Sequence, residues 1–263
     1  MVKGEIGFRC GSPEPRRLEA RDAEPITAAT RGGVIRVMDE DERPMNFADA
    51  RKWMVDGQVR PNKVTDLRII EAMLDLPRHL FVPQHCVARA HADEDVPLGH
   101  GRALMQPMMM ARLVQLAEVR EGETALVLGA GSSYGAALLA RLGARVTAVE
   151  DDAALLSLAR SALADSAMLA PGSVQLVEAA PATGAPAGPF DVIMLEGEVP
   201  AIPTAISDRL AEGGRLIGVC HAPGRSGAAI LGRRAGGAFS VTEAFDCTTA
   251  PLPGFAPEPG FVF

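Results

Sequence analysis

The chain has 263 residues, enough for one large domain or two small ones with a substantial core. Hydrophobic residues make up 48%, the mean hydropathy is +0.12 and no run of 18 apolar residues occurs, which predicts a globular protein that does not span a membrane. The formal net charge of −7 disfavours nucleic acid as a partner, because affinity for nucleic acid depends on neutralising phosphates with Lys and Arg.

Cysteine usage and the first residues predict the compartment. Four cysteines lie far apart and show no C-x-x-C spacing, as is typical of reduced cytosolic thiols: Cys10, Cys86, Cys220 and Cys247. Lys3 and Arg9 are followed by neither an apolar stretch nor a small-residue cleavage site, which disfavours export by that route. We therefore expect a cytoplasmic protein, and the sequence leaves its oligomeric state open.

Residues 1–44 differ in composition from the rest of the chain. They carry Arg, Glu, Asp, Pro and Gly with little periodicity, so they cannot bury enough apolar surface to order themselves. We predict a disordered N-terminal extension over residues 1–44 and a single domain over residues 45–263.

Residues 45–123 are predicted to form a helical region followed by a loop. Apolar residues recur at helical spacing over 47–59 and 65–76, with Thr65 as the cap of the second helix and Trp53 in the core. The acidic stretch 90–99 is predicted to be a loop that ends in a turn, and Pro107 suits the first turn of a further helix.

Three histidines in this region could suggest a metal site. His79, His85 and His91 are six residues apart, whereas ligands on one helical face recur every three or four residues. No second cluster completes a site, so we predict no bound metal.

The most informative stretch is residues 124–150, TALVLGAGSSYGAALLARLGARVTAVE, which predicts strand, glycine turn, helix and strand. Gly129 and Gly131 let the backbone turn sharply and let a ligand approach without meeting a Cβ atom. Ser132 and Ser133 open the helix, whose first amides face such a ligand. Glu150 stands 21 residues after Gly129, where nucleotide-binding α/β proteins place an acid that accepts from ribose hydroxyls. We therefore predict a ligand that contains a ribose.

Two known nucleotide fingerprints are approached without being matched. The pattern G-x-G-x-x-G requires its third glycine at Tyr134, but that glycine comes one residue later, which disfavours a nicotinamide dinucleotide. The fingerprint of S-adenosylmethionine proteins requires an acid and a third glycine where this chain has Val127 and Ser133. A tight corner without any ligand would explain the glycines, but it would leave Glu150 to chance.

Strands and helices continue to alternate after residue 150. Helices are expected over 153–163, capped by Asp152, and over 203–210, and strands over 174–177, 190–195 and 215–219. This alternation predicts an α/β fold with a mostly parallel sheet, helices on both faces and ligands at the carboxyl ends of the strands. Residues 228–231 and 239–245 are predicted to add antiparallel structure at the sheet edge.

From Met45 onward the chain resembles the protein-L-isoaspartate O-methyltransferase family, in a divergent bacterial branch. The resemblance is carried by a series of signatures in a fixed order: MVDGQVRPNKVTD (54–66), PRHLFVP (77–83), VPLG (96–99), GRALMQP (101–107), the glycine turn, PFDVI (189–193), AIP (201–203) and LAEGGRLIGV (210–219). It implies a Rossmann-like class I methyltransferase sheet. Within that fold, residues 45–123 would form the helical and substrate-loop region, 124–220 the cofactor-binding core and 221–263 the C-terminal strands.

The family further implies S-adenosyl-L-methionine as methyl donor and a carboxylate acceptor, typically an isoaspartyl residue of a damaged protein that is thereby repaired. The residues implied at the donor are Gly129, Ala130, Gly131, Ser132, Ser133, Glu150, Asp151 and Gln106. Those implied near the acceptor are Asp93, Leu98 and Met105, with Gln106 close to them. A sulfonium is already activated and a carboxylate is ionised at neutral pH, so positioning and exclusion of water suffice without a general base.

The chain departs from the family pattern at several positions. Met105 stands where members usually carry the Ser or Thr assigned to catalysis, so no catalytic residue is predicted. Val127 replaces the acid that steadies the amino group of the donor, a role that Glu178 or Glu196 could take over. Residues 179–181 replace the Gly-Asp-Gly that meets the adenine, and His91 replaces a tyrosine.

Two lost polar contacts predict donor binding that is weaker by on the order of tens to hundreds of fold. Two alternatives therefore stay open. One is a non-catalytic relative that keeps the fold as a binding protein, and the other is a methyltransferase with a different acceptor.

Overall fold

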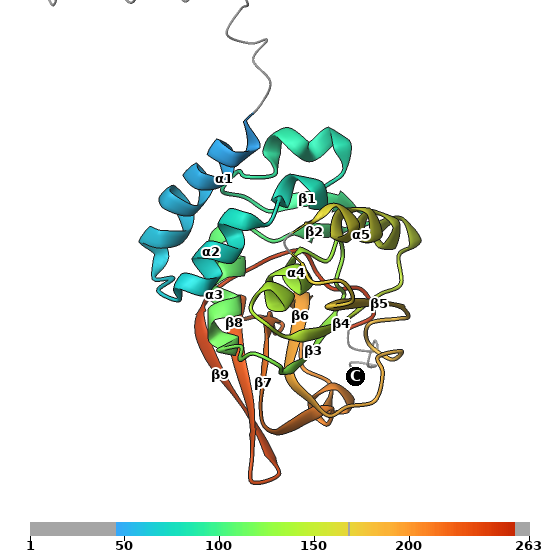
Figure 1. Cartoon of the computed structure of the whole chain (residues 1–263). Coiled ribbons are helices and arrows are strands. Elements are labelled where there is room, and N and C mark those ends of the chain that lie inside the picture. Colours follow the sequence, from blue (N-terminus) through green and yellow to red (C-terminus); the bar gives the residue numbers. More distant parts are fainter. Residues whose placement is uncertain (1–45, 168, 256–263) are drawn as a thin grey trace, which may run out of the picture. The chain divides into compact units, whose positions relative to one another are not determined.

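A seven-stranded sheet organises residues 46–167 and 169–255, the part of the chain that the computed structural model describes (Figure 1). Its order is β5-β4-β3-β6-β7-β8-β9. The strands are β3 (Thr124–Leu128), β4 (Arg145–Glu150), β5 (Val174–Glu178), β6 (Phe190–Val199), β7 (Leu210–Cys220), β8 (Ala228–Ala235) and β9 (Ala238–Asp246). The first five are parallel and the last two antiparallel, so the predicted α/β fold class is confirmed. The predicted N-terminal extension lies outside the described residues.

The sheet separates two apolar cores because neighbouring residues of a strand point to opposite faces. Val127, Met194 and Ile217 are in register on adjacent strands and belong to the first core. The residues that precede them on the same strands are Leu126, Ile193 and Leu216, and they belong to the second core. Burial on both faces explains why the central strands are almost continuously apolar.

The first core is covered by helices and the second mainly by loops. The helices are α1 (Phe47–Met54), α2 (Leu67–Asp75), α3 (Pro107–Ala117), α4 (Tyr134–Arg141), α5 (Ala153–Asp165) and α6 (Thr204–Ser207). Each of the helices α1 to α5 contributes buried residues to the first core, whereas Ile206 of α6 belongs to the second. Ala185 and Leu252 add loop side chains to the second core, so both faces are covered.

Several predicted helix boundaries require correction. Helix α2 is capped by Asp66, whose carboxylate accepts from the Arg68 amide, while the Thr65 amide donates to Gln115. The predicted helix over 47–59 is α1 followed by a π-helical turn, Val55–Val59. Trp53 is 71% exposed, so its predicted place in the core is wrong. Asp152 caps α5 as predicted, with its carboxylate accepting from two amides of the first turn.

The predicted loop at 90–99 contains a strand. β1 (Val96–Gly99) pairs antiparallel with β2 (Arg102–Leu104), and side chains of this hairpin reach the turn after β3. Short helical turns precede it at Arg78–Phe81 and Gln84–Arg89. The helix expected over 203–210 shortens to α6, because β7 already begins at Leu210.

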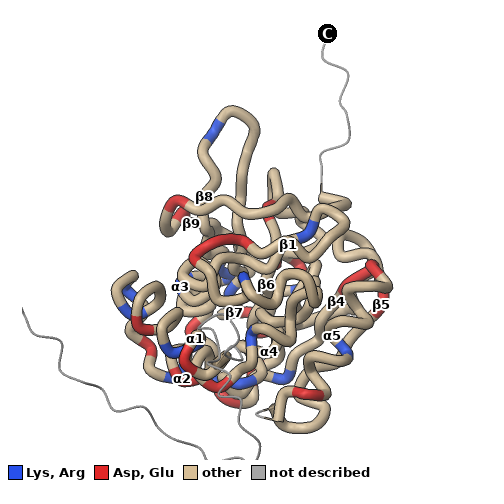
Figure 2. Tube along the Cα trace, turned by 90° about the horizontal axis from the view of Figure 1, so that it is seen from above, with Lys and Arg blue, Asp and Glu red and all other residues tan. Residues whose placement is uncertain are grey.

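Charged residues of both signs are spread along the trace (Figure 2). No helix among residues 46–167 and 169–255 has the length and apolar character needed to cross a membrane. Cys86, Cys220 and Cys247 are free thiols, whereas Cys10 lies outside the described residues.

Candidate functional site

The turn after β3, residues Gly129 to Ser133, forms a buried corner at the carboxyl edge of the sheet, which we call the glycine corner. Gly129, Gly131 and Ser133 have positive φ angles of 67°, 52° and 67°. The Ala130 amide donates to the Val149 carbonyl at 3.0 Å, which ties the corner to β4. Positive φ favours glycine, so Ser133 holds a strained backbone at the place where the S-adenosylmethionine fingerprint has its third glycine.

Glu150 at the end of β4 points into this corner and is fully buried. Its Oε2 accepts from the Gly131 amide at 2.7 Å, and its Oε1 accepts from the amides of Asp151 and Asp152 at 3.1 and 3.2 Å. The Nη1 of Arg102 donates to both oxygens, at 2.9 Å to Oε2 and 3.2 Å to Oε1. The carboxylate predicted to meet a ribose is therefore paired with an arginine of the same chain.

Arg102 comes from strand β2 and is only 6% exposed. Besides pairing with Glu150, its guanidinium uses Nη2 to donate to the carbonyl of Gly129 and, at 3.3 Å, to that of Glu196. One side chain thus contacts a carboxylate and two carbonyls around the glycine corner.

Leu252 fills space directly above Gly129. A Cβ atom placed on Gly129 would overlap the Leu252 side chain, and one placed on Gly131 would lie 3.2 Å from the Cδ1 of Leu98. The Leu252 segment is fixed along β6, where its amide donates to the Glu198 carbonyl at 2.8 Å. The Glu198 amide donates in turn to the Ala250 carbonyl at 3.0 Å.

Of the two acids that could replace Val127, only Glu196 lies at the glycine corner. Glu178 is exposed and stands 3.9 Å from Arg160. Glu196 is 6% exposed, and burial raises its pKa to about 8, although the positive charge of Arg102 acts in the opposite direction. Its Oε2 has no hydrogen-bond partner among the described residues.

Other polar groups at the corner are also buried without partners. In the described part of the chain this holds for the hydroxyls of Ser132, Ser133 and Tyr134. The Arg78 guanidinium lies 4.9 Å above the Tyr134 ring, and the Nη1 of Arg78 lacks a partner as well. Buried polar groups without partners cost free energy, and a bound polar ligand would supply the missing hydrogen bonds.

The residues predicted near the acceptor form a second group. Gln106 donates from Nε2 to the Asp93 carboxylate at 2.7 Å, and Asp93 is exposed. Met105 is 1% exposed, and its carbonyl accepts from the Nη2 of Arg78 at 2.7 Å. Leu98 lies instead beside Gly131 at the glycine corner.

Sequence reasoning missed Asp95, which joins three segments at this edge. One oxygen accepts from the Gln106 amide at 2.7 Å, and the other accepts from the Thr249 hydroxyl at 2.6 Å. The acidic loop, the start of α3 and the segment that carries Leu252 are thereby linked. An aspartate among several acids in one loop carried no signal that could have singled it out.

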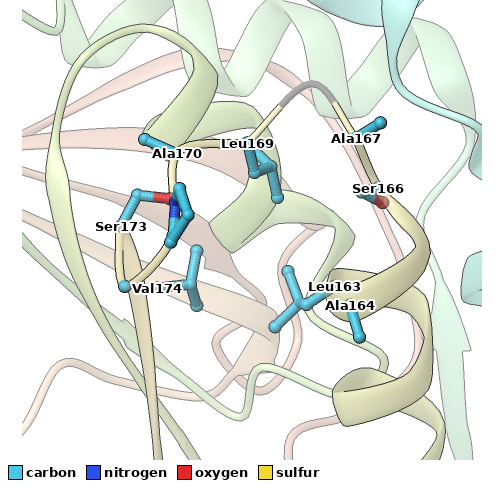
Figure 3. A pocket seen from close by; sticks show the side chains of 10 residues that line it. Leu163, Ala164, Ser166, Ala167, Leu169, Ala170, Ser173 and Val174 are labelled. Atoms are coloured by element: carbon cyan, nitrogen blue, oxygen red, sulfur yellow. The ribbon is translucent and has the colours of Figure 1, made fainter.

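Two surface hollows of the described residues are lined by residues outside the glycine corner. Figure 3 shows one of about 560 Å³ between the end of α5 and the start of β5, lined by residues such as Leu163 and Val174. Another, of about 430 Å³, includes Gln106, His221 and Cys247 in its lining. The Nδ1 of His221 lies 2.8 Å from a carboxylate oxygen of Glu198. At the glycine corner itself, Arg102 pairs with Glu150 and Leu252 packs on Gly129, so these two side chains take the space that a donor would need.

The strand order, with a glycine turn opposite the acid that ends the next strand, defines the fold of Rossmann-like methyltransferases. The profile of protein-L-isoaspartate(D-aspartate) O-methyltransferase matches residues 51–253. The chain therefore belongs to the protein-L-isoaspartate O-methyltransferase family, as the resemblance in sequence predicted.

Individual relatives agree with this assignment. Protein-L-isoaspartate O-methyltransferase 1 of Pelobacter propionicus is 34% identical over 215 residues, which are 80% of this chain and 98% of the relative. The Geobacter metallireducens enzyme is 39% identical over 179 residues, covering 66% and 79% of the two chains.

The fold is shared with a Plasmodium falciparum protein-L-isoaspartate O-methyltransferase solved with S-adenosyl-L-homocysteine. The TM-score is 0.64 at 18% identity, covering 80% of this chain and 99% of the other.

Proposed function

We propose that the protein is an S-adenosyl-L-methionine-dependent O-methyltransferase that acts on a carboxylate, the side chain of an isoaspartyl residue in a damaged protein. The observation that supports this most strongly is the match to the family over residues 51–253, together with 34% identity across 98% of the Pelobacter propionicus enzyme. The substrate is a protein or peptide rather than a nucleic acid or a membrane. The three free thiols are compatible with a cytoplasmic location.

The acceptor side of the site agrees with a peptide substrate. Asp93 is exposed, Gln106 is half-buried, and the hollow of about 430 Å³ beside Gln106 gives a side chain room to enter from the surface. An isoaspartyl carboxylate is ionised at neutral pH, so this side of the protein only has to hold and desolvate it.

The test is transfer of a radiolabelled methyl group from S-adenosylmethionine to an isoaspartyl peptide, with its aspartyl twin as the matched control. We expect label on the isoaspartyl peptide only, released by mild base as expected for a methyl ester. Label on both peptides, or on neither while other proteins become labelled, would instead indicate a methyltransferase with a different acceptor.

The occupied glycine corner supports a second candidate, a non-catalytic member of the family that keeps the fold as a binding protein. Arg102 pairs with Glu150, and Leu252 packs on Gly129, where a donor would lie. Calorimetric titration of the unmodified protein with S-adenosylhomocysteine separates the two. A dissociation constant in the range of about 1–100 µM favours the enzyme, and no heat at about 1 mM ligand favours the binding protein.

A further inference from the structure

We propose that Arg102 is a built-in occupant of the donor site, held there with Leu252, so that the donor can bind only after both side chains leave the glycine corner. The inference rests on the proposed function in one respect, namely that the glycine corner is the donor site of this fold.

Arg102 donates hydrogen bonds to three groups at the glycine corner. Its guanidinium takes the carboxylate of Glu150 and the carbonyls of Gly129 and Glu196 at the same time. Glu150 at the end of β4 is the acid expected to hold ribose hydroxyls, and free carbonyls at the corner are acceptors that a donor ammonium could use. Every one of these acceptors is therefore already engaged by one internal cation.

Leu252 packs closely against Gly129 and Gly197. A methyl group on Gly129 would overlap Leu252, and on Gly197 it would lie 2.9 Å from the Cβ of Leu252. Leu252 is 3% exposed and its segment is hydrogen-bonded to Glu198 on β6. The space that glycines normally leave for a ligand is filled by a leucine of the last described segment.

Arg102 also balances the negative charge of Glu150. Glu150 is buried and needs a positive partner, and Glu196 lies beside it without a hydrogen-bond partner for Oε2 among the described residues. S-adenosylmethionine carries a sulfonium, an ammonium and a carboxylate at neutral pH, so its net charge equals that of an arginine side chain. Arg102 therefore supplies the charge that the bound donor would supply.

The opposite edge of the sheet offers a matched control. Arg215 is 5% exposed, pairs with Glu123 at 2.7 Å and donates to the carbonyls of Ala117 and Glu118. Arg215→Gln removes a comparable number of contacts of a buried arginine without touching the glycine corner, so it reports the effect of weakening the fold alone.

The experiment is calorimetric titration of the full chain with S-adenosylmethionine, comparing the unmodified protein, Arg102→Gln, Leu252→Ala, the double variant and Arg215→Gln. We expect weak binding by the unmodified protein, binding at least about tenfold tighter by the double variant, and no gain for Arg215→Gln. Each single variant should fall between the unmodified protein and the double variant. Leu252→Ala keeps all charges, so it remains informative if Arg102→Gln folds poorly.

Thermal unfolding provides a second readout that does not depend on activity. S-adenosylmethionine should raise the Tm of the double variant more than that of Arg215→Gln or of the unmodified protein, because stabilisation by a ligand increases with its affinity.

Two results would overturn the proposal. One is low-micromolar binding by the unmodified protein that Arg102→Gln weakens. The other is a folded double variant that still gives no heat. Failure of the proposed function would give a different result. If the double variant binds tightly but no variant methylates the isoaspartyl peptide, the protein is not the proposed methyltransferase, whereas Arg102 and Leu252 do block the donor site.

Discussion

Two buried arginines pair with glutamates at opposite edges of the same sheet. Arg215 and Glu123 lie at the amino edge, where Arg215 also donates to the carbonyls of Ala117 and Glu118 at the end of α3. Arg102 and Glu150 lie at the carboxyl edge, where Arg102 also donates to carbonyls of the glycine corner. Their chemistry is nearly the same, but their positions in the fold are different.

The comparison separates a structural pair from an occupying one. Carbonyls at a helix C-terminus lack hydrogen-bond partners within the helix, and Arg215 donates to two of them at the end of α3. The acceptors around Arg102 lie where parallel α/β sheets bind ligands, so Arg102 makes hydrogen bonds that a ligand would otherwise make. The meaning of a buried ion pair therefore depends on which end of the sheet it occupies.

The largest expected effect comes from removing either arginine. Arg102→Met should lower the free energy of unfolding by about 3–5 kcal/mol, because it leaves the buried Glu150 carboxylate without its partner. Arg215→Met should lower it by about 2–3 kcal/mol, because Glu123 is only partly buried. Urea unfolding measures this loss. Adding Glu150→Gln to Arg102→Met should recover part of it, since the uncompensated charge is then removed. A loss below about 1 kcal/mol for either single variant would contradict the burial argument.

The next effect is a pH dependence at Glu196, whose pKa burial raises from its ordinary 4.5 to about 8. The folded state keeps a proton that the unfolded state releases, so stability should fall as pH rises from 4.5 to about 8 and level off above that. Glu196→Gln imitates the protonated acid and should remove this decline, a difference on the order of a few kcal/mol at pH 8.

The Glu196 prediction is measured by urea unfolding at a series of pH values. Glu178→Gln is the control, because Glu178 is exposed. Parallel pH curves for the unmodified protein and Glu196→Gln would show that Glu196 does not hold the proton.

A smaller effect is expected at Met105, which is buried and whose own carbonyl accepts a hydrogen bond from Arg78. Met105→Ser should cost about 2–3 kcal/mol, because it leaves a cavity and buries a hydroxyl. It should restore little methyl transfer alone, since Arg102 and Leu252 still fill the corner. Combined with Arg102→Gln and Leu252→Ala it should raise transfer to the isoaspartyl peptide, and a rise with Met105→Ser alone would argue that the corner opens readily.

The smallest effect is expected for an exposed pair. Arg68 lies 2.6 Å from Asp66, and its side chain is 51% exposed. Arg68→Gln should change the free energy of unfolding by no more than about 1 kcal/mol, because solvent screens the pair. A loss close to that of Arg215→Met in the same urea experiment would remove the contrast between buried and exposed pairs.

Features with a local signature were predictable from the sequence. The glycine turn, the acid at Glu150 and the cap at Asp152 each depend on residues a few positions apart or at a known spacing, and the structure has the turn, the acid at the end of β4 and the cap. The order of family signatures predicted the fold class and the family.

Features that depend on distant partners were not predictable. Arg102 meets a glutamate 48 residues away, and Leu252 reaches Gly129 from the far end of the chain. An arginine in the short run Arg102–Leu104 gives no sign of its partner, because burial and pairing are set by tertiary structure. Trp53 shows the converse, since its apolar ring suggested the core and yet it is exposed on α1.

The two occupants of the glycine corner arrive from separate parts of the chain, Arg102 from hairpin β1–β2 and Leu252 from the segment beside β6. Opening the corner thus requires two displacements. The rate at which a small molecule binds there is limited by how often both side chains are displaced at the same time. Association would then reach a plateau as the concentration of that molecule rises, a kinetic behaviour set by the protein rather than by diffusion.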